Sequence, residues 1–229
     1  MTYTEDSRNK IMNTIRSSLG VSGDEAERIT RTSIRLDQHK PNLIPERARK
    51  TQLENIALFR NMMESQSATV VELKGMDDVP GAVAGYLRDN NLAAEIRMGS
   101  DPILTELTWS AALALETKIG KAVPQDSAAL SRAFGAAAET GTLFLLSGVD
   151  NPTTLNFLPE THIVVLRKVD IAGSYEEVWE QLREVQGQRT MPRTVNLISG
   201  PSRTADIEQT IIMGAHGPRR MCILLVGTT

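Results

Sequence analysis

The chain has 229 residues, of which 41% are hydrophobic and 23% charged, proportions that exclude collagen-like and wholly disordered chains. Its formal net charge of −3 leaves no overall positive field to hold a polyanion, so we do not expect nucleic-acid binding. The length suits one large domain, or a smaller domain with an extension.

Residues 1–66 predict a helical N-terminal extension. Gly20 is expected to end the first helix, and residues 20–46, which are polar and contain two prolines, predict a loop or linker. The two apolar stripes of the extension pack either on the chain's own core or on a partner. Both have helical spacing, and they consist of Ile11, Met12, Ile15 and Leu19, and of Leu53, Ile56, Phe59 and Met63.

From residue 67 to 229, short apolar runs alternate with helical patterns. This alternation predicts an α/β domain with a mostly parallel sheet flanked by helices, because continuous apolar runs suit strands that are buried on both faces. The expected strands are 69–73, 93–97, 143–146, 162–166, 195–198 and 222–226. The expected helices are 77–89, 174–186 and 204–213, with a mixed segment at 103–115.

Missing motifs exclude several further classes. Cys222 is the single cysteine, so this chain alone forms no disulfide, no Cys-rich zinc site and no iron–sulfur cluster. Gly120-Lys121 lacks the upstream glycine and the following Ser or Thr of a P-loop. The acidic start has no secretory pattern, and no apolar run reaches the roughly 18 residues of a membrane span, so we expect a cytoplasmic protein.

Three glycine-bearing segments could carry chemistry, and the first precedes the expected strand 143–146. Thr140, Gly141 and Thr142 could hold an anionic oxygen with their hydroxyl and backbone N–H groups. Glu139 could act as a base or as a covalent nucleophile. The alternative is a tight turn whose glutamate faces water.

The second segment follows the expected strand 195–198. Ser199, Gly200, Ser202 and Thr204 lie where a strand gives way to an expected helix, whose N-terminus would favour an anion. Arg203 could clamp that anion through two hydrogen bonds. Alternatively, Ser202 or Thr204 only caps the helix.

The third segment lies between the expected helix 204–213 and the last strand. His216, between two glycines, could transfer a proton near neutral pH, and Arg219 could attract an anion. A polar loop with an incidental histidine is the alternative.

Two catalytic arrangements fail in these segments. Ser202, Asp206 and His216 follow the chain order of an α/β-hydrolase triad, but the second glycine of the nucleophile elbow is missing. Asp206 and Glu208 would point to different faces of a helix, so we expect no metal site there.

The chain resembles the LUD-domain family, and within it the lactate utilization protein C type (LutC/YkgG). The resemblance rests on Ser199-Gly-Pro-Ser-Arg-Thr-Ala-Asp-Ile-Glu208 followed by Gly214-Ala-His-Gly-Pro218, and in order it covers residues 139–226. Ala215 departs from the bulkier aliphatic residue expected there, and the first 40 residues carry no family feature.

The resemblance implies a NagB/RpiA/CoA-transferase-like fold and a part in bacterial oxidation of L-lactate to pyruvate. Iron–sulfur clusters are then expected in partner subunits, with no cofactor in this chain. We expect an accessory subunit that binds a small anionic metabolite at the three segments, and a homo-oligomer is compatible with this. The alternatives are a CoA-transferase or sugar-phosphate isomerase-like enzyme that uses Glu139, and an interaction module whose N-terminal helices recruit partners.

Overall fold

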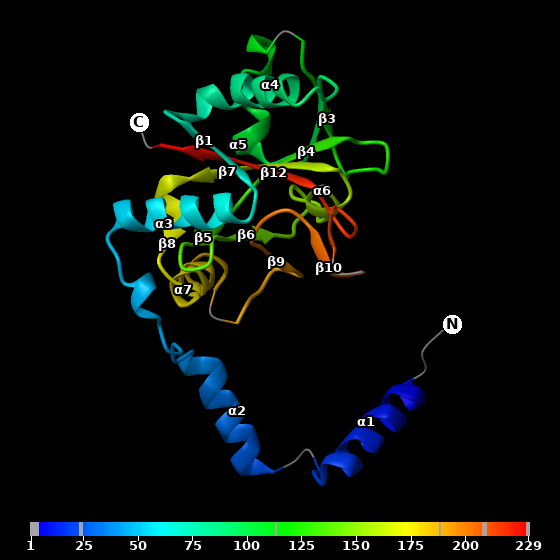
Figure 1. Cartoon of the computed structure of the whole chain (residues 1–229). Helices are drawn as coiled ribbons and strands as arrows, with labels where there is room; N and C mark the ends of the chain where they lie inside the picture. Colours follow the sequence, from blue (N-terminus) through cyan, green and yellow to red (C-terminus); the bar gives the residue numbers. More distant parts are fainter. Residues whose placement is uncertain (1–4, 23–24, 113, 188, 208–209, 228–229) are drawn as a thin grey trace. The chain divides into compact units, whose positions relative to one another are not determined.

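The computed structural model describes residues 5–22, 25–112, 114–187, 189–207 and 210–227 (Figure 1). The chain divides into two units, residues 1–42 and 43–229, and each is described by itself. The boundary expected between residues 66 and 67 does not coincide with this division. The reason is that α3 (Gln52–Ser65) buries Phe59 and Met63 in the core of the second unit.

The first unit contains α1 (Glu5–Leu19) and α2 (Ala26–Gln38), and neither helix has a buried residue. The first helix ends as predicted, at Gly20, whose φ of 64° suits a glycine. The prediction of a loop or linker over residues 20–46 is wrong for α2. The sequence of α2 is mostly polar, so no apolar stripe indicates a helix there.

The second unit is built on a parallel six-stranded sheet with the order β1-β12-β7-β4-β2-β3, which confirms the α/β prediction (Figure 1). The apolar strands β7 and β12 lie inside this sheet and are buried on both faces. The strands are β1 (Thr69–Leu73), β2 (Glu95–Met98), β3 (Glu116–Ile119), β4 (Ala128–Arg132), β7 (Thr161–Arg167) and β12 (Arg220–Val226).

A second sheet has the order β8-β5-β6-β9 and mixes parallel and antiparallel pairs. One core cluster joins α3 and β6 to the inner face of the central sheet, with Met63, Leu143 and Val164 among its members. The second sheet and α3 therefore cover the same face of the central sheet. The strands are β5 (Gly135–Ala137), β6 (Thr142–Leu146), β8 (Ile171–Ala172) and β9 (Val195–Ile198).

Two longer helices form the outer layers. Val79 and Leu87 of α4 (Val79–Asp89) pack on the other face of the central sheet, and Val178 of α7 (Tyr175–Gln186) packs on the second sheet (Figure 1). None of the described helices is long and apolar enough to cross a membrane. The shorter helices are η1 (Glu46–Ala48), η2 (Met76–Asp78), α5 (Pro102–Thr105), η3 (Trp109–Ala111), α6 (Thr154–Phe157) and η4 (Lys168–Asp170).

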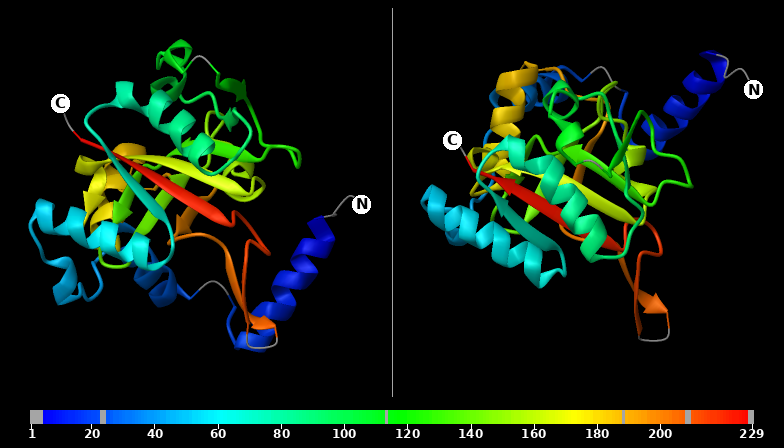
Figure 2. Two further views of the ribbon diagram at one scale, coloured as in Figure 1. Left: turned by 45° about the horizontal axis from the view of Figure 1, so that its top comes forward. Right: turned by 90° about the horizontal axis from the view of Figure 1, so that it is seen from above.

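The prediction of a helix over residues 204–213 is wrong. This segment forms an antiparallel hairpin of β10 (Arg203–Ile207) and β11 (Thr210–Met213), in which Arg203 pairs with Met213. Figure 2 shows the hairpin projecting from the second unit. Its Thr and Ile residues are β-branched, and branching at Cβ favours strands over helices.

Candidate functional site

The first and second predicted segments meet in a cluster of hydroxyl groups. Thr142 begins β6 and Ser199 follows β9, and the antiparallel pairing of these strands sets the two residues side by side. Oγ1 of Thr142 lies 2.7 Å from Oγ of Ser199, 2.7 Å from Oγ1 of Thr140 and 2.6 Å from the hydroxyl of Tyr175. Thr140, Thr142 and Ser199 are among the predicted site residues, whereas Tyr175 belongs to no motif and was not predicted.

Glu139 has a structural task that neither of its predicted roles included. Its carboxylate is buried and accepts a hydrogen bond of 3.1 Å from the backbone N–H of Tyr175, the first residue of α7. A carboxylate at a helix N-terminus is stabilised by the helix dipole. Glu139 therefore holds the start of α7, and its position does not favour the nucleophile that the transferase alternative requires.

Gly141 and Gly200 fit closely against the end of α3. Both have positive φ values, 65° and 126°, which favour glycine. An added Cβ would lie 2.7 Å from Cβ of Met62 at position 141, and 2.8 Å from Cβ of Gln66 at position 200. Both predicted glycines thus serve close packing of loops on the residues that end α3.

Arg203 and Thr204 lie in the hairpin, so the expected helix N-terminus beside Ser202 does not exist. The guanidinium of Arg203 donates to Oγ of Ser67 at 2.7 Å and to Oε1 of Gln66 at 3.4 Å. Arg203 is therefore tied to the turn after α3. Glu208 lies outside the described residues.

The second and third segments meet mainly through their backbones. Ser202 donates its N–H to the carbonyl of Pro218 at 2.8 Å, and its hydroxyl accepts the N–H of His216 at 3.3 Å. The side chains of His216 and Arg219 are exposed. Among the described residues, no hydrogen bond joins Thr140 to Arg203 or His216.

A crevice that contains none of the predicted site residues lies at the carboxyl ends of β2 and β3. It has a volume of about 670 Å3, within the usual range for ligand sites. Lys121 follows β3, and the loop that connects β6 to α6 forms much of the wall. Its lining consists of Lys121, Ser147, Gly148, Val149, Pro152, Thr153, Thr154, Arg193 and Thr194.

This wall loop rests directly on the end of β2. An added Cβ at Gly99 would lie 1.8 Å from the backbone oxygen of Asp150, and Oγ of Ser100 donates to Oδ1 of Asp150 at 2.6 Å. The order in which the chain adds strands to the central sheet reverses between β2 and β4. From β2 the chain continues outward to the edge strand β3, and it then returns to β4 on the other side of β2. Open α/β sheets bind ligands at such points, outside the carboxyl ends of their strands.

The lining of the crevice combines apolar surface with two positively charged side chains and several hydroxyl groups. Lys121 and Arg193 form no ion pair within the described part of the chain, and no carboxylate residue lines the crevice. Oγ1 of Thr154 accepts the N–H of Ala122 at 3.1 Å, which leaves its own O–H free to donate. The arrangement suits a small anion with several oxygen atoms.

Two buried titratable groups lie away from solvent. Burial lowers the pKa of His162 to about 3, and its Nε2 lies 2.6 Å from Oγ of Ser131. Burial raises the pKa of the Cys222 thiol to about 12. Both groups are therefore neutral near pH 7.

Comparison with known proteins gives the family. A model of the LUD domain matches residues 56–226. "Lactate utilization protein C" from Shouchella clausii is 33% identical over 89 residues, and its namesake from Halalkalibacterium halodurans is 37% identical over 91, each alignment covering 39% of both chains. "Uncharacterized protein YkgG" from Escherichia coli is 37% identical over 89 residues, or 38% of each chain. The aligned segment thus spans about two fifths of each relative.

A solved structure shares the fold. A DUF162 family protein from Deinococcus radiodurans superimposes with a TM-score of 0.56 at 20% identity, over 78% of this chain and 99% of that one. The likeness confirms the α/β architecture that the sequence predicted. Since the LUD model covers most of the second unit, the chain belongs to the LUD domain family.

Proposed function

We propose that this chain is an accessory subunit of a bacterial system that oxidises L-lactate to pyruvate, and that it binds a small carboxylate anion in the crevice. Membership of the LUD family and the names of the lactate utilization relatives support this role. The observation that carries the proposal is a pair of cations, Lys121 and Arg193, which have no ion-pair partner in the part of the chain that the structure describes and which line a crevice without carboxylates.

The lining suits a 2-hydroxy or 2-oxo acid. An arginine can bind both oxygens of a carboxylate through its planar guanidinium, and a lysine adds a compact positive charge. In this proposal Arg193 and Lys121 hold the carboxylate. The hydroxyls of Thr153 and Thr194 then face the neighbouring hydroxyl or keto oxygen.

Electron transfer is assigned to partner proteins. An iron–sulfur cluster is held by several thiolates, whereas this chain has one thiol, which is buried and neutral. The chain would therefore bind and position the acid while clusters in iron–sulfur partner subunits accept the electrons.

Calorimetric titration of the full chain with L-lactate and pyruvate tests the site. Lys121→Ala and Arg193→Ala should each weaken binding about tenfold, because each removes hydrogen bonds to a charged group. Arg203→Ala is the matched control, since it removes a cation from the predicted loops and should leave binding unchanged. Absence of binding to the wild-type chain would overturn the proposal, as would loss of binding in Arg203→Ala alone.

Growth on L-lactate tests the accessory role. A bacterium that lacks the gene for this chain should lose growth on L-lactate and keep growth on pyruvate. The wild-type gene should restore growth, and a gene with both Lys121→Ala and Arg193→Ala should not. Normal growth of the deletion strain on L-lactate would refute the role.

A further inference from the structure

The helices α1 and α2 of the first unit leave their apolar side chains in water. None of the described residues of either helix is buried. On α1, Ile11, Ile15 and Leu19 are spaced four residues apart and share one face. On the mostly polar α2, Ile29 and Leu36 are seven residues apart and share one face. Each of these five residues is at least 46% exposed, and we call the two groups the N-terminal apolar faces.

The first unit does not bury these faces itself, although its helices are short. α1 has 15 residues and α2 has 13, and isolated helices of such lengths are only marginally stable in water. Most helical stability in proteins comes from the packing of an apolar face on a neighbour. The LUD model begins at residue 56, so the first unit also lies outside the family domain. The two helices therefore gain stability from whatever surface covers their apolar faces.

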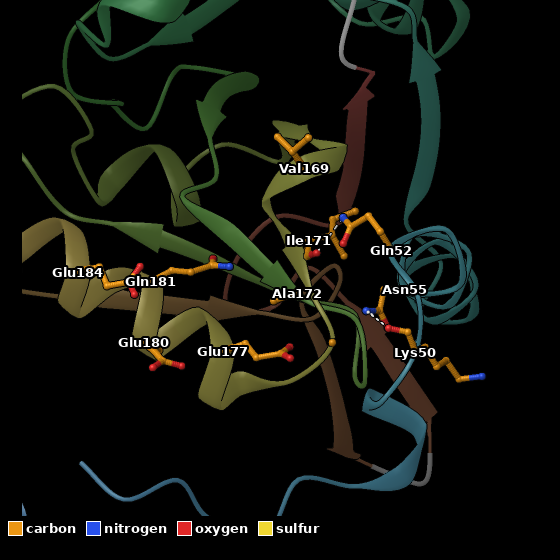
Figure 3. Close-up of a pocket in the computed structure, with 11 residues that line it drawn as sticks. Lys50, Gln52, Asn55, Val169, Ile171, Ala172, Glu177, Glu180, Gln181 and Glu184 are labelled. Carbon is orange, nitrogen blue, oxygen red and sulfur yellow. Dashed lines mark hydrogen bonds between the residues drawn. The ribbon is translucent and has the colours of Figure 1, made fainter. Parts of the chain in front are cut away.

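Two cavities of the second unit match these faces poorly. The cavity beside α7 has a volume of about 360 Å3, and its lining includes the charged residues Lys50, Glu180 and Glu184 (Figure 3). Apolar side chains placed there would take water from these charged groups. The cavity at the carboxyl end of α4 is mostly apolar, but its volume of about 510 Å3 suits single side chains rather than the faces of two helices about 20 Å long.

The charges of the first unit favour another protein helix over an anionic membrane. Residues 1–42 contain seven Lys or Arg and six Asp or Glu, so the surplus of positive charge that attracts a helix to anionic lipid is almost absent. The two signs are ordered along each helix. Acidic side chains stand in the first turn and a basic side chain in the last, with Glu5 and Arg16 in α1 and Glu27 and Arg35 in α2. Antiparallel neighbours therefore bring opposite charges together.

We propose that two copies of this chain associate through α1 and α2, and that the four helices form an antiparallel bundle with the N-terminal apolar faces inside. A second copy supplies the same apolar faces and the same order of charges. A two-fold arrangement of the copies then covers the faces of all four helices at once.

Sedimentation equilibrium of the full chain tests the proposal. The wild type should have twice the 25.1 kDa mass of one chain at concentrations of about 1–100 µM. The double variant Ile15→Asp and Ile29→Asp should dissociate at least about 100-fold more readily, because each copy would bury two unpaired charges. Val185→Asp is the matched control, since Val185 is a 70% exposed apolar residue of α7 outside the bundle, and it should leave the dimer unchanged. A wild type that is monomeric at about 100 µM would overturn the proposal, and so would a dimer that persists in the double variant.

A mixing experiment tests the antiparallel order. One variant carries Glu5→Arg and Glu27→Arg, and the other carries Arg16→Glu and Arg35→Glu. Each should form weaker dimers alone, because like charges then meet at the helix ends, and an equimolar mixture should favour the mixed dimer by about fivefold. Equal stability of the mixed and unmixed dimers would overturn the antiparallel order. Flotation of a monomeric wild type with phosphatidylglycerol vesicles would assign the apolar faces to lipid and overturn the proposal.

Discussion

Replacing Gly99 with alanine tests whether the end of β2 holds the wall of the crevice. The new Cβ would lie 1.8 Å from the backbone oxygen of Asp150 and 3.2 Å from Cδ of Pro152. Because the nearer obstacle is backbone, the wall loop must retreat by roughly 1 Å, and overpacking of this kind costs about 1–3 kcal/mol. Loss of the hydrogen bond between Ser100 and Asp150 adds to this. We expect the free energy of unfolding to fall by about 2–3 kcal/mol.

Gly148→Ala is the matched control, because it adds a methyl group to the same loop with no atom within 4 Å of the new Cβ. Thermal and urea unfolding should show a melting temperature about 5–10 °C lower for Gly99→Ala and nearly unchanged for Gly148→Ala. Pyruvate binding should be weaker in Gly99→Ala than in the wild type. Equal stability of the two variants, or wild-type pyruvate binding by Gly99→Ala, would refute the reasoning.

Three further predictions concern the fold. Gly81→Ala should stabilise the protein by about 0.5–1 kcal/mol in urea unfolding, because Gly81 lies in α4 with open space around its Cα, and a loss of stability would contradict this. Ser174→Ala should lower the free energy of unfolding by about 1 kcal/mol, because it breaks the buried capping box of α7. Ser110 is exposed, and a smaller loss for Ser174→Ala than for Ser110→Ala would contradict this prediction. The pKa of His162 falls from 6.5 to about 3 on folding, so its contribution to stability is complete above pH 6.5 and is lost as the pH falls toward 3. In urea unfolding, the wild type should lose about 2 kcal/mol more of its free energy of unfolding than His162→Gln when the pH is lowered from 7.5 to 5. Equal losses in the two proteins would refute this prediction.

Six strands of the second unit could be predicted from local patterns, whereas β3, β4, β5 and β8 were not expected. Strands β1 and β9 begin and end where the apolar runs predicted, and the capped helix α7 differs from the prediction by one residue. Burial on both faces gives such strands a continuous apolar sequence that is hard to mistake. The hairpin at residues 203–213 was missed, because Ile207, Ile211 and Ile212 fit helical spacing as well as a strand.

The candidate site was predicted only in part. The hydroxyl cluster of Thr140, Thr142 and Ser199 forms because β6 and β9 pair. Lys121 and Arg193 are far apart in the sequence, and neither belongs to a motif, so their approach depends on tertiary structure. In the sequence, Gly120-Lys121 resembles only an incomplete P-loop. The signal that could have pointed to Lys121 is its place directly after a strand of a parallel sheet.

A crystal structure of the full chain grown with saturating pyruvate tests the central proposal most directly. We expect the carboxylate of pyruvate to lie in the crevice between Nζ of Lys121 and the guanidinium of Arg193. Pyruvate bound instead at Thr140, Ser199 and Arg203, or an empty crevice at saturating pyruvate, would contradict the account.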